Sequence, residues 1–352
     1  MLLTGILAAA TPAPTPAQVL RGRVVEAGAE TGAPGAIVEL RDDAGAVVAA
    51  RLTDSEGRFA LRAPAGRYSL RMSRIGHEDV ERQVEIGPEG ASFLQIDAPL
   101  RPLVLPPLEV EGASACGLDP VRGRRVFAVW SEMRKALETT RLTLRDGGHR
   151  YRVRLHERIL DARGWPRGAG DEATRKVVLD DPQAFHTLPA EDLLRDGFVR
   201  PVDDALAWFG PDLEVLLADA FTGTRCFDLR EEGGPAGDRI GLRFRPAERH
   251  GPPDIRGTLW LDAATHELRS LEFAYARLEG PAAQVRDVGG ELEFRRLPSG
   301  GWIVSEWRIR VPIFRREHLE TGRFRQGFLE SRTAMRLIGY EERGGRVVEV
   351  LP

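Results

Sequence analysis

The sequence predicts a mainly β protein with two domains, a seven-stranded immunoglobulin-like sandwich followed by an α+β domain built on an antiparallel sheet. Three observations lead to this prediction. The chain has 352 residues, 42% of them hydrophobic, which is enough for two domains that each bury a core. From Val19 onward, short alternating segments are punctuated by Gly, Pro and Asp, as in antiparallel β structure. A proline-rich stretch at residues 101–115 then separates the two parts.

The charge balance excludes one class of partner. There are 50 Lys+Arg against 53 Asp+Glu, a formal net charge of -3, whereas a dedicated nucleic-acid binder needs a basic footprint. Lysine occurs only at Lys135 and Lys176, so nearly all positive charge is arginine. We interpret that skew as genomic base composition rather than as a sign of anion binding.

Residues 1–18 are expected to be a signal peptide or leader. Leu2 to Ala10 is an apolar run too short to span a membrane, and a segment of small residues and prolines follows it. No Lys or Arg precedes Arg21, so the alternatives are an initiator further upstream, an atypical signal, or a frayed leader of a cytosolic protein. We expect export, to the periplasm or to the outer membrane or cell surface. No later run approaches the roughly 20 apolar residues of a transmembrane helix.

Residues 19–100 carry the sandwich. Its turns have a physical cause: Asp54 can accept backbone N–H groups in a type I turn, Gly57 tolerates positive φ, and Phe59 then points inward. The hydroxyl of Tyr68 can reach the sandwich edge. The predicted strands are Leu20 to Glu26, Ala36 to Arg41, Val47 to Thr53, Arg58 to Arg62, Arg67 to Met72, Val80 to Ile86 and Ser92 to Ile96.

Five ordered motifs in this segment resemble the carboxypeptidase regulatory-like domain family. They are Gly22-x-Val24, Gly35-Ala36-x-Val38-x-Leu40, Thr53-Asp54-x-x-Gly57-x-Phe59, Pro64-x-Gly66-x-Tyr68-x-Leu70 and Ile75-Gly76. His77 departs from the family, which usually has an aromatic there; we interpret it as a partly buried strand-end residue. The resemblance implies a transthyretin-like sandwich, found beside metallocarboxypeptidase domains and at the front of bacterial outer-membrane receptors, and it implies no catalysis.

The linker, residues 101–115, is expected to be semi-rigid because it contains Pro102, Pro106 and Pro107. Its segment Leu108 to Gly112 resembles the segment that precedes the plug of TonB-dependent receptors, which makes an accessory protein of outer-membrane receptor systems one alternative function.

Residues 116–352 are predicted to form the α+β domain. An amphipathic helix is expected at Arg122 to Thr140, with Val126, Val129, Trp130, Met133 and Leu137 on its core stripe. Shorter helices are expected at Pro189 to Arg195 and Pro211 to Phe221, the latter with Pro at its first position. Strands are expected around Tyr151 to Leu155 and at Ile240 to Arg245, Gly257 to Leu261, Leu268 to Tyr275, Glu291 to Leu297, Trp302 to Val311, Arg332 to Tyr340 and Arg346 to Val350.

A second, softer resemblance covers part of this domain. Gly257 to Asp262 running into Glu267 to Phe273, then Gly290 to Phe294 and Gly301 to Val304, looks like the curved-sheet repeats of periplasmic lipoprotein carriers. It would imply a concave apolar sheet that holds an acyl chain. An ordinary sheet packed on its own helices is the alternative that the sequence favours.

Motifs for catalysis, cofactors and metals are missing. No histidine has Glu three residues later, and there is no His-Glu-x-x-His, Gly-x-Ser-x-Gly or Ser-x-x-Lys. The glycine pairs Gly289-Gly290 and Gly344-Gly345 are assigned to hairpins rather than to phosphate loops. The basic stretches 145–158 and 308–325 are interpreted as solvated sheet faces. We therefore predict no enzyme, no catalytic or metal residues and no cofactor.

The two cysteines, Cys116 and Cys226, both fall beyond the linker. In an oxidising compartment an even pair within one domain predicts a disulfide, and its loop would span 110 positions. Two free buried thiols in a cytosolic fold are the alternative.

The leading functional hypothesis is a non-catalytic exported protein of the bacterial envelope that binds or scaffolds, with a glycan or peptide as ligand and an envelope protein as a further partner. A lipid or lipoprotein carrier is the second hypothesis and requires an open apolar cavity. An unrecognised enzyme is the third and requires titratable residues that converge in one cleft.

Overall fold

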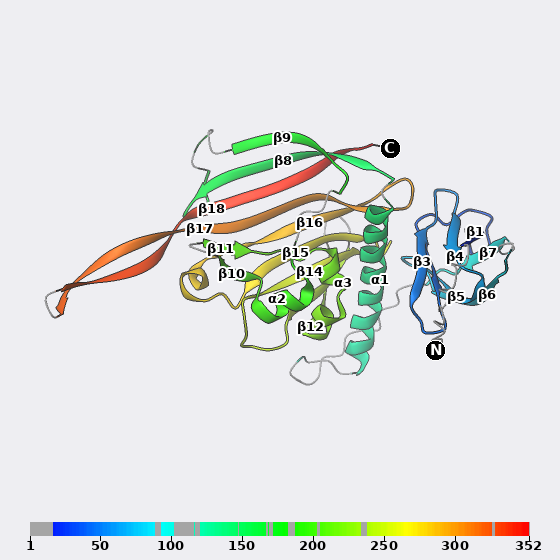
Figure 1. Ribbon diagram of the computed structural model, residues 1–352, viewed down its shortest axis with the longest axis horizontal. Coiled ribbons are helices and arrows are strands. Elements are labelled where there is room, and N and C mark those ends of the chain that lie inside the picture. The colour runs from blue at the N-terminus through cyan, green and yellow to red at the C-terminus, as the bar shows by residue number, and fades with distance from the viewer. Residues whose placement is uncertain are drawn as a thin grey trace, which may run out of the picture. The chain divides into compact units, whose positions relative to one another are not determined.

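The structure is a computed structural model (Figure 1). It describes residues 17–88, 93–101, 116, 120–146, 148–166, 168, 172–181, 187–202, 205–233, 238–325 and 328–351. The predicted leader and linker therefore lie outside the described residues, apart from residues 17, 18 and 101, and so does the receptor-like segment at 108–112. The chain divides into two compact units, the first reaching to Arg74 and including Glu78–Leu100, and the second comprising Ile75–His77 and everything from Arg101 onward.

The first unit is a sandwich of two sheets. Three strands pair in the order β4-β1-β7 and four in the order β3-β2-β5-β6, with β1 and β7 parallel and the other pairs antiparallel. Leu20, Leu40, Leu61, Leu70 and Ile96 are among its buried core residues. The seven predicted strands are confirmed within one or two residues at their ends: β1 Gln18–Glu26, β2 Ile37–Arg41, β3 Val47–Leu52, β4 Arg58–Ala63, β5 Gly66–Ser73, β6 Val80–Ile86 and β7 Leu94–Ala98.

The turns of the sandwich form as predicted. One carboxylate oxygen of Asp54 accepts the backbone N–H groups of Glu56 at 2.9 Å and Arg58 at 2.8 Å, and Gly57 has a φ of 77°. Phe59 is buried, and the Tyr68 hydroxyl donates to a backbone carbonyl four residues earlier at 2.9 Å. The side chains of Asp54 and Tyr68 thereby satisfy backbone groups that the turns leave unpaired.

The second unit is built on a nine-stranded sheet in which every neighbouring pair is antiparallel, in the order β12-β13-β14-β15-β16-β17-β18-β8-β9. A separate hairpin pairs β10 with β11. The helices are α1 Pro120–Arg145, α2 Ala190–Asp196, α3 Leu213–Leu217 and α4 Asp219–Gly223, with a 3-10 helix at Gly280–Gln284. The strands are β8 Arg150–Asp161, β9 Glu172–Leu179, β10 Val199–Val202, β11 Ala205–Trp208, β12 Arg225–Glu232, β13 Arg239–Pro246, β14 Asp254–Asp262, β15 Leu268–Ala276, β16 Gly289–Arg296, β17 Trp302–Arg325 and β18 Phe328–Leu351.

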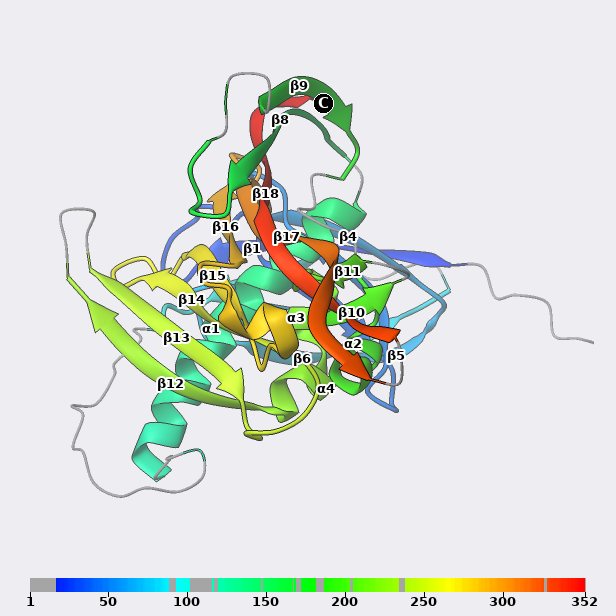
Figure 2. The same cartoon turned by 90° about the vertical axis from the view of Figure 1, so that its left-hand side faces the viewer.

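The core lies between this sheet and the helices (Figures 1 and 2). On α1, Val126, Val129, Met133 and Leu137 of the predicted stripe are buried and Trp130 is half-buried, as expected for an amphipathic helix on a sheet. Ring contacts tie the helices to the sheet: Trp130 of α1 lies 5.9 Å from Phe227, Phe221 of α4 lies 5.7 Å from Phe244, and Trp208 of β11 lies 4.8 Å from Tyr275. We call this side of the sheet the inner face and the opposite side the outer face.

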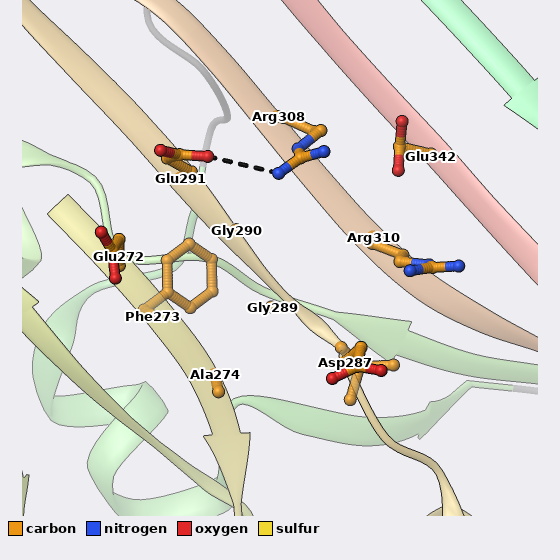
Figure 3. Close-up of a pocket in the computed structure, with 11 residues that line it drawn as sticks. Glu272, Phe273, Ala274, Asp287, Gly289, Gly290, Glu291, Arg308, Arg310 and Glu342 are labelled. Atoms are coloured by element: carbon orange, nitrogen blue, oxygen red, sulfur yellow. Dashed lines mark hydrogen bonds and ion pairs between the residues drawn. The ribbon is translucent and has the colours of Figure 1, made fainter. Parts of the chain in front are cut away.

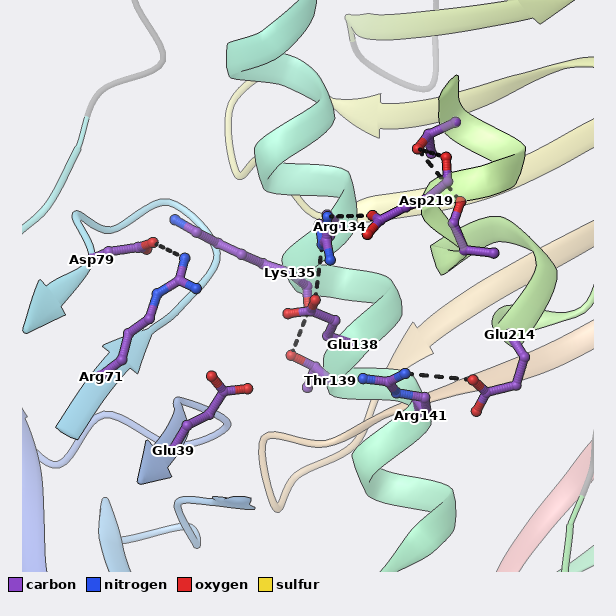
Figure 4. Close-up of polar contacts among 12 residues, drawn as sticks. Glu39, Arg71, Asp79, Arg134, Lys135, Glu138, Thr139, Arg141, Glu214 and Asp219 are labelled. Carbon is purple, nitrogen blue, oxygen red and sulfur yellow. Dashed lines mark hydrogen bonds and ion pairs between the residues drawn. The ribbon is translucent and has the colours of Figure 1, made fainter. Parts of the chain in front are cut away.

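Ion pairs fix α1 against the short helices (Figure 4). Arg141 and Arg145 of α1 both reach Glu214 of α3, at 3.5 and 3.1 Å, and Arg134 reaches Asp219 of α4 at 3.7 Å. These pairs are at least partly exposed, so each contributes less than about 1 kcal/mol and orients the helices more than it stabilises them.

Three predictions about the second unit were wrong in detail. The single helix expected at Pro211 to Phe221 is two helices: Asp212, not Pro211, caps the first by accepting the N–H of Val215 at 2.9 Å, and the extended backbone of Ala218 (ψ 130°) separates the second. This break places Phe221 against Phe244. Strands β9 to β12 were not predicted.

Where the sequence predicts three strands at the C-terminal end of the chain, the structure has two long strands, β17 and β18. Strands β17 and β18 pair from Glu306 opposite Arg346 out to Arg325 opposite Phe328, whereas β18 pairs with β8 only from Gly339 onward. Beyond that point they run as a two-stranded ribbon, orange to red in Figure 1. None of the described helices is long and apolar enough to cross a membrane.

Candidate functional site

Side chains on the outer face follow rows that run across the strands, because directly paired residues share one face of a sheet. One row is Arg243, Thr258, Glu272, Glu291 and Arg308, followed by Gly344 and His156. The next row is Arg256, Ala274, Gly289, Arg310, Glu342 and Arg158. Residues from seven strands, β13 to β18 and β8, thereby meet on one surface.

Small residues lie in the middle of the second row. Ala274 of β15 is paired with Gly289 of β16, and Gly289 has a φ of 153°. A methyl group at Gly289 would overlap the backbone of Phe273 and Ala274, so only glycine fits there. With so little side-chain volume over two adjacent strands, the surface is hollowed between the charged residues on either side.

Three adjoining hollows of about 500, 410 and 280 Å³ lie on this face. The first two share Glu272, Phe273 and Ala274, and the last two share Glu291, Arg308 and Glu342. We call the three together the outer groove. It runs from β13 across β14, β15, β16 and β17 to β18 and β8.

The end over β13 and β14 is basic. Arg243, Arg245 and Arg256 line the hollow of about 500 Å³, and Glu272 is its one carboxylate. Asp228 holds Arg243 through two contacts, at 2.9 Å to Nε and 2.7 Å to Nη2. Arg245 and Arg256 are exposed, and within the described part of the chain no hydrogen bond or ion pair engages either guanidinium.

The middle of the groove is acidic (Figure 3). Its hollow of about 410 Å³ is lined by Glu272, Asp287, Glu291 and Glu342 against Arg308 and Arg310. Glu291 accepts from Arg308 at 3.3 Å, and Glu342, only 5% exposed at its side chain, pairs with Arg158 at 2.6 Å. Arg310 lies over the ring of Tyr340 at 4.8 Å.

The third hollow places two carboxylates opposite each other. Glu293 of β16 is paired with Glu306 of β17, and Arg346 forms a bidentate contact with Glu306 at 2.8 and 2.9 Å. Desolvation, and then the charges of Glu306 and Glu291, raise the pKa of Glu293 above its ordinary value, while Arg346 opposes this. The carboxyl group of Glu293 therefore gains a proton at a higher pH than an ordinary glutamate does.

The predicted disulfide lies beside the basic end. Cys116 and Cys226 are joined, with their Cα atoms 5.2 Å apart. Cys226 of β12 is the direct cross-strand partner of Arg245. The disulfide therefore anchors residue 116 to the strand that borders the basic hollow.

The other residues singled out from the sequence fall as follows. In β8, Tyr151 and Val153 are buried while Arg150, Arg152 and Arg154 are exposed, in agreement with the interpretation of a solvated basic face. His77 is buried more fully than expected, at 5% exposure. Among the residues that the structure describes, no three His, Cys, Asp or Glu side chains converge as metal ligands would.

Sequence reasoning missed the groove. Arg308 and Arg310 were assigned to a solvated face, but they line the groove. The pairs Gly289-Gly290 and Gly344-Gly345 were assigned to hairpins, yet they lie within β16 and β18. Neighbouring backbone occupies the side-chain space at Gly289, and the rings of Phe273, His156 and Trp307 occupy it at the other three glycines. The sequence signal that could have placed these glycines within strands is the alternation of polar and apolar residues that flanks each pair.

Comparison with known proteins identifies the first unit. Residues 19–100 match the model of the carboxypeptidase regulatory-like domain, which confirms the resemblance that its motifs indicated. A comparison with curated protein sequences finds no match.

Among solved structures, the chain is similar to a DUF1329 family protein from Desulfovibrio piger, at 10% identity over 60% of this chain and 92% of that one, with a TM-score of 0.24. A TM-score this low carries no argument about fold or function. The likeness to lipoprotein carriers therefore remains a resemblance drawn from the sequence.

Proposed function

We propose that this protein, whose first unit is a carboxypeptidase regulatory-like domain, is a non-catalytic binding module of the bacterial envelope. The ligand in this proposal is an extended polar molecule, such as an envelope glycan, and it lies in the outer groove. The observation that carries the proposal is the groove itself, with small residues along its floor and arginines and carboxylates along its walls.

The dimensions of the groove suit an extended ligand. Arg256 of β14 and Arg310 of β17 flank the floor formed by Ala274 and Gly289. With strands about 4.8 Å apart, the three strand spacings between them separate the two arginines by about 14 Å. A ligand of several sugar or amino-acid units could lie across this distance and meet donors and acceptors throughout.

The chemistry of the groove favours such a ligand over an acyl chain. A lipid carrier would use an open apolar face, but Leu242, Leu259 and Leu271 on the inner face of this sheet are fully buried in the core that it forms with the helices. The three hollows described above have charged walls instead. The lipid-carrier alternative has no comparable observation in its favour.

Two features support export. The Cys116–Cys226 disulfide is a bond that persists in oxidising compartments, such as the periplasm or the cell surface. Domains like the one at residues 19–100 also stand at the front of bacterial outer-membrane receptors, as its resemblance implies. Exported protein analysed by mass spectrometry without reductant should contain the disulfide and lack the leader.

Binding measurements test the proposed ligand class. Calorimetry of the full chain against neutral oligosaccharides, oligogalacturonates, muropeptides and phosphatidylglycerol vesicles should detect binding to at least one glycan class and none to the vesicles. Ala274→Trp fills the floor of the groove and should weaken that binding at least tenfold. Ala60→Trp, at an exposed position of β4, is the matched control and should leave it unchanged. Binding to vesicles alone, or glycan binding that survives Ala274→Trp, would contradict the proposal.

A further inference from the structure

We infer that the basic end of the outer groove is an anion subsite, and that the ligand carries a carboxylate or phosphate group there. The inference rests on the proposed function, because it names the chemistry of one end of the same ligand. The residues that carry it are Arg243, Arg245 and Arg256.

The first argument is the placement of two like charges side by side. Phe244 pairs with Gly257, so the adjacent residues Arg245 and Arg256 face each other across β13 and β14, and both point to the outer face. Like charges directly opposite each other in a sheet are unfavourable. An anion between the two guanidinium groups would remove the repulsion.

The second argument is the local charge balance. Three arginines elsewhere on this face pair with carboxylates, Arg308 with Glu291, Arg158 with Glu342 and Arg346 with Glu306, and Arg310 lies over the ring of Tyr340. In the basic hollow, Asp228 forms an ion pair with Arg243. Glu272 is then the one carboxylate of the hollow that can balance the charges of Arg245 and Arg256.

The third argument is geometric. A guanidinium group presents parallel N–H donors that fit the two oxygens of a carboxylate or phosphate, so neighbouring arginines are well suited to such a group. The hollow of about 500 Å³ leaves room for it beside Thr258 and above Gly257. Asp228 orients the side chain of Arg243, which supplies a third guanidinium group at the rim of the hollow.

The acidic middle of the groove gives the ligand a direction. Four carboxylates and two arginines line that hollow, whereas three arginines and one carboxylate line the basic one. An anionic group is attracted to the hollow over β13 and β14 and repelled from its neighbour. The remainder of the ligand, directed over Ala274 and Gly289, meets acceptors for its hydroxyl or amino groups.

The test uses inorganic tripolyphosphate and citrate as separate probes, which distinguish phosphate from carboxylate recognition. Calorimetry with the full chain at about 0.15 M salt, where exposed charges are screened beyond about 8 Å, should detect binding of at least one probe. Arg245→Gln with Arg256→Gln should weaken that binding at least tenfold. The control pair Arg21→Gln with Arg62→Gln makes the same charge change at exposed positions of the neighbouring strands β1 and β4, and should change the affinity less than twofold.

A second pair of variants protects the test against misfolding. Ala274 is the direct cross-strand partner of Arg256, so Ala274→Glu places a carboxylate opposite that arginine and should reduce probe binding at least fivefold while the fold is retained. Ala274→Gln fills nearly the same volume without the charge and is the matched reference, so Ala274→Glu should bind the probe at least fivefold more weakly than Ala274→Gln does. Equal affinities of these two variants would overturn the anion subsite.

The outcomes separate this inference from the proposed function. Equal losses in the Arg245/Arg256 and Arg21/Arg62 variants, or a wild type that binds neither probe, would overturn the anion subsite. If glycans bind in a manner sensitive to Ala274→Trp while both anions fail, the inference falls and the proposed function stands. If the anions bind as expected and no glycan does, the anion subsite stands and the proposed ligand class is wrong.

Discussion

At the scale of single residues, the carboxyl group that departs most clearly from ordinary behaviour in the groove is Glu293. It faces Glu306 across two strands, and its pKa is raised by desolvation and by the neighbouring carboxylates. A raised carboxyl pKa means that the native protein binds the proton more tightly than the unfolded chain does. The free energy of unfolding therefore increases as the pH falls from above the raised pKa toward the ordinary value of about 4.3.

Glu293→Gln removes this charge and should stabilise the second unit at pH 7, by roughly 0.2–1 kcal/mol, the range for directly opposed pairs in a sheet. Urea unfolding followed by tryptophan fluorescence measures the change. The difference in unfolding free energy between the variant and the wild type should shrink as the pH is lowered from above the raised pKa of Glu293 toward about 4.3. Glu279→Gln, at an exposed position outside the groove, is the control. A Glu293 variant less stable than wild type at pH 7 would show that its charge is favourable.

At the scale of elements, most strands could be predicted because side chains alternate between a buried and an exposed face. In β8, for example, Tyr151 and Val153 alternate with arginines, and the alternation survives in the structure. The full length of β17 and β18 could not be predicted in this way, because their outer parts, from Phe314 to Arg325 and from Phe328 to Leu337, pair with each other and with no other described strand. Helix α4 was missed because the break at Ala218 depends on how Phe221 packs.

The large sheet also depends on glycines that accept aromatic rings from a neighbouring strand. The ring of Trp307 in β17 occupies the space over Gly345, its partner in β18. Gly345→Ala would place a methyl group within that ring, so the unfolding free energy should fall by about 1–3 kcal/mol, the usual cost of overpacking a core. Gly148→Ala, where the added methyl group meets no neighbour, should change it by less than about 0.5 kcal/mol.

The double variant Gly345→Ala with Trp307→Leu tests the mechanism. If the ring and the methyl group compete for one space, Gly345→Ala should cost less in a chain that already carries Trp307→Leu than it does in the wild type. Equal costs in both backgrounds would mean that the backbone at Gly345, rather than Trp307, requires glycine.

At the scale of the whole molecule, the sequence predicted two domains with one disulfide in the second. It could not predict the groove, because its residues lie between His156 and Glu342 and meet only through the register of seven strands. No local sequence pattern indicates that Arg256, Ala274 and Gly289 lie in one row across neighbouring strands. The first unit could be identified from its motifs since each motif covers a short local segment, such as the turn that Asp54 forms with Glu56 and Arg58.

The disulfide links distant parts of the second unit. Its loop spans 110 positions, and chain entropy gives a stabilisation of roughly 4–5 kcal/mol for a loop of about that length. Cys116→Ala with Cys226→Ala should reduce the unfolding free energy of the second unit by an amount of this order, measured by tryptophan fluorescence in urea. Wild-type protein unfolded in the presence of dithiothreitol should show the same reduction. Unchanged stability in both experiments would mean that the bond does not constrain the unfolded chain.

Carboxyl footprinting is the most direct test of the claim that the ligand lies in the outer groove. Glu272 is exposed on the groove wall, and Glu30 is exposed in the sandwich. Both are labelled by a carbodiimide and glycine ethyl ester, with and without the glycan that calorimetry selects, and mass spectrometry reads the extent of labelling. We predict that the glycan protects Glu272 and leaves Glu30 unchanged. Protection of Glu30 with no change at Glu272 would place the ligand on the sandwich and contradict this account.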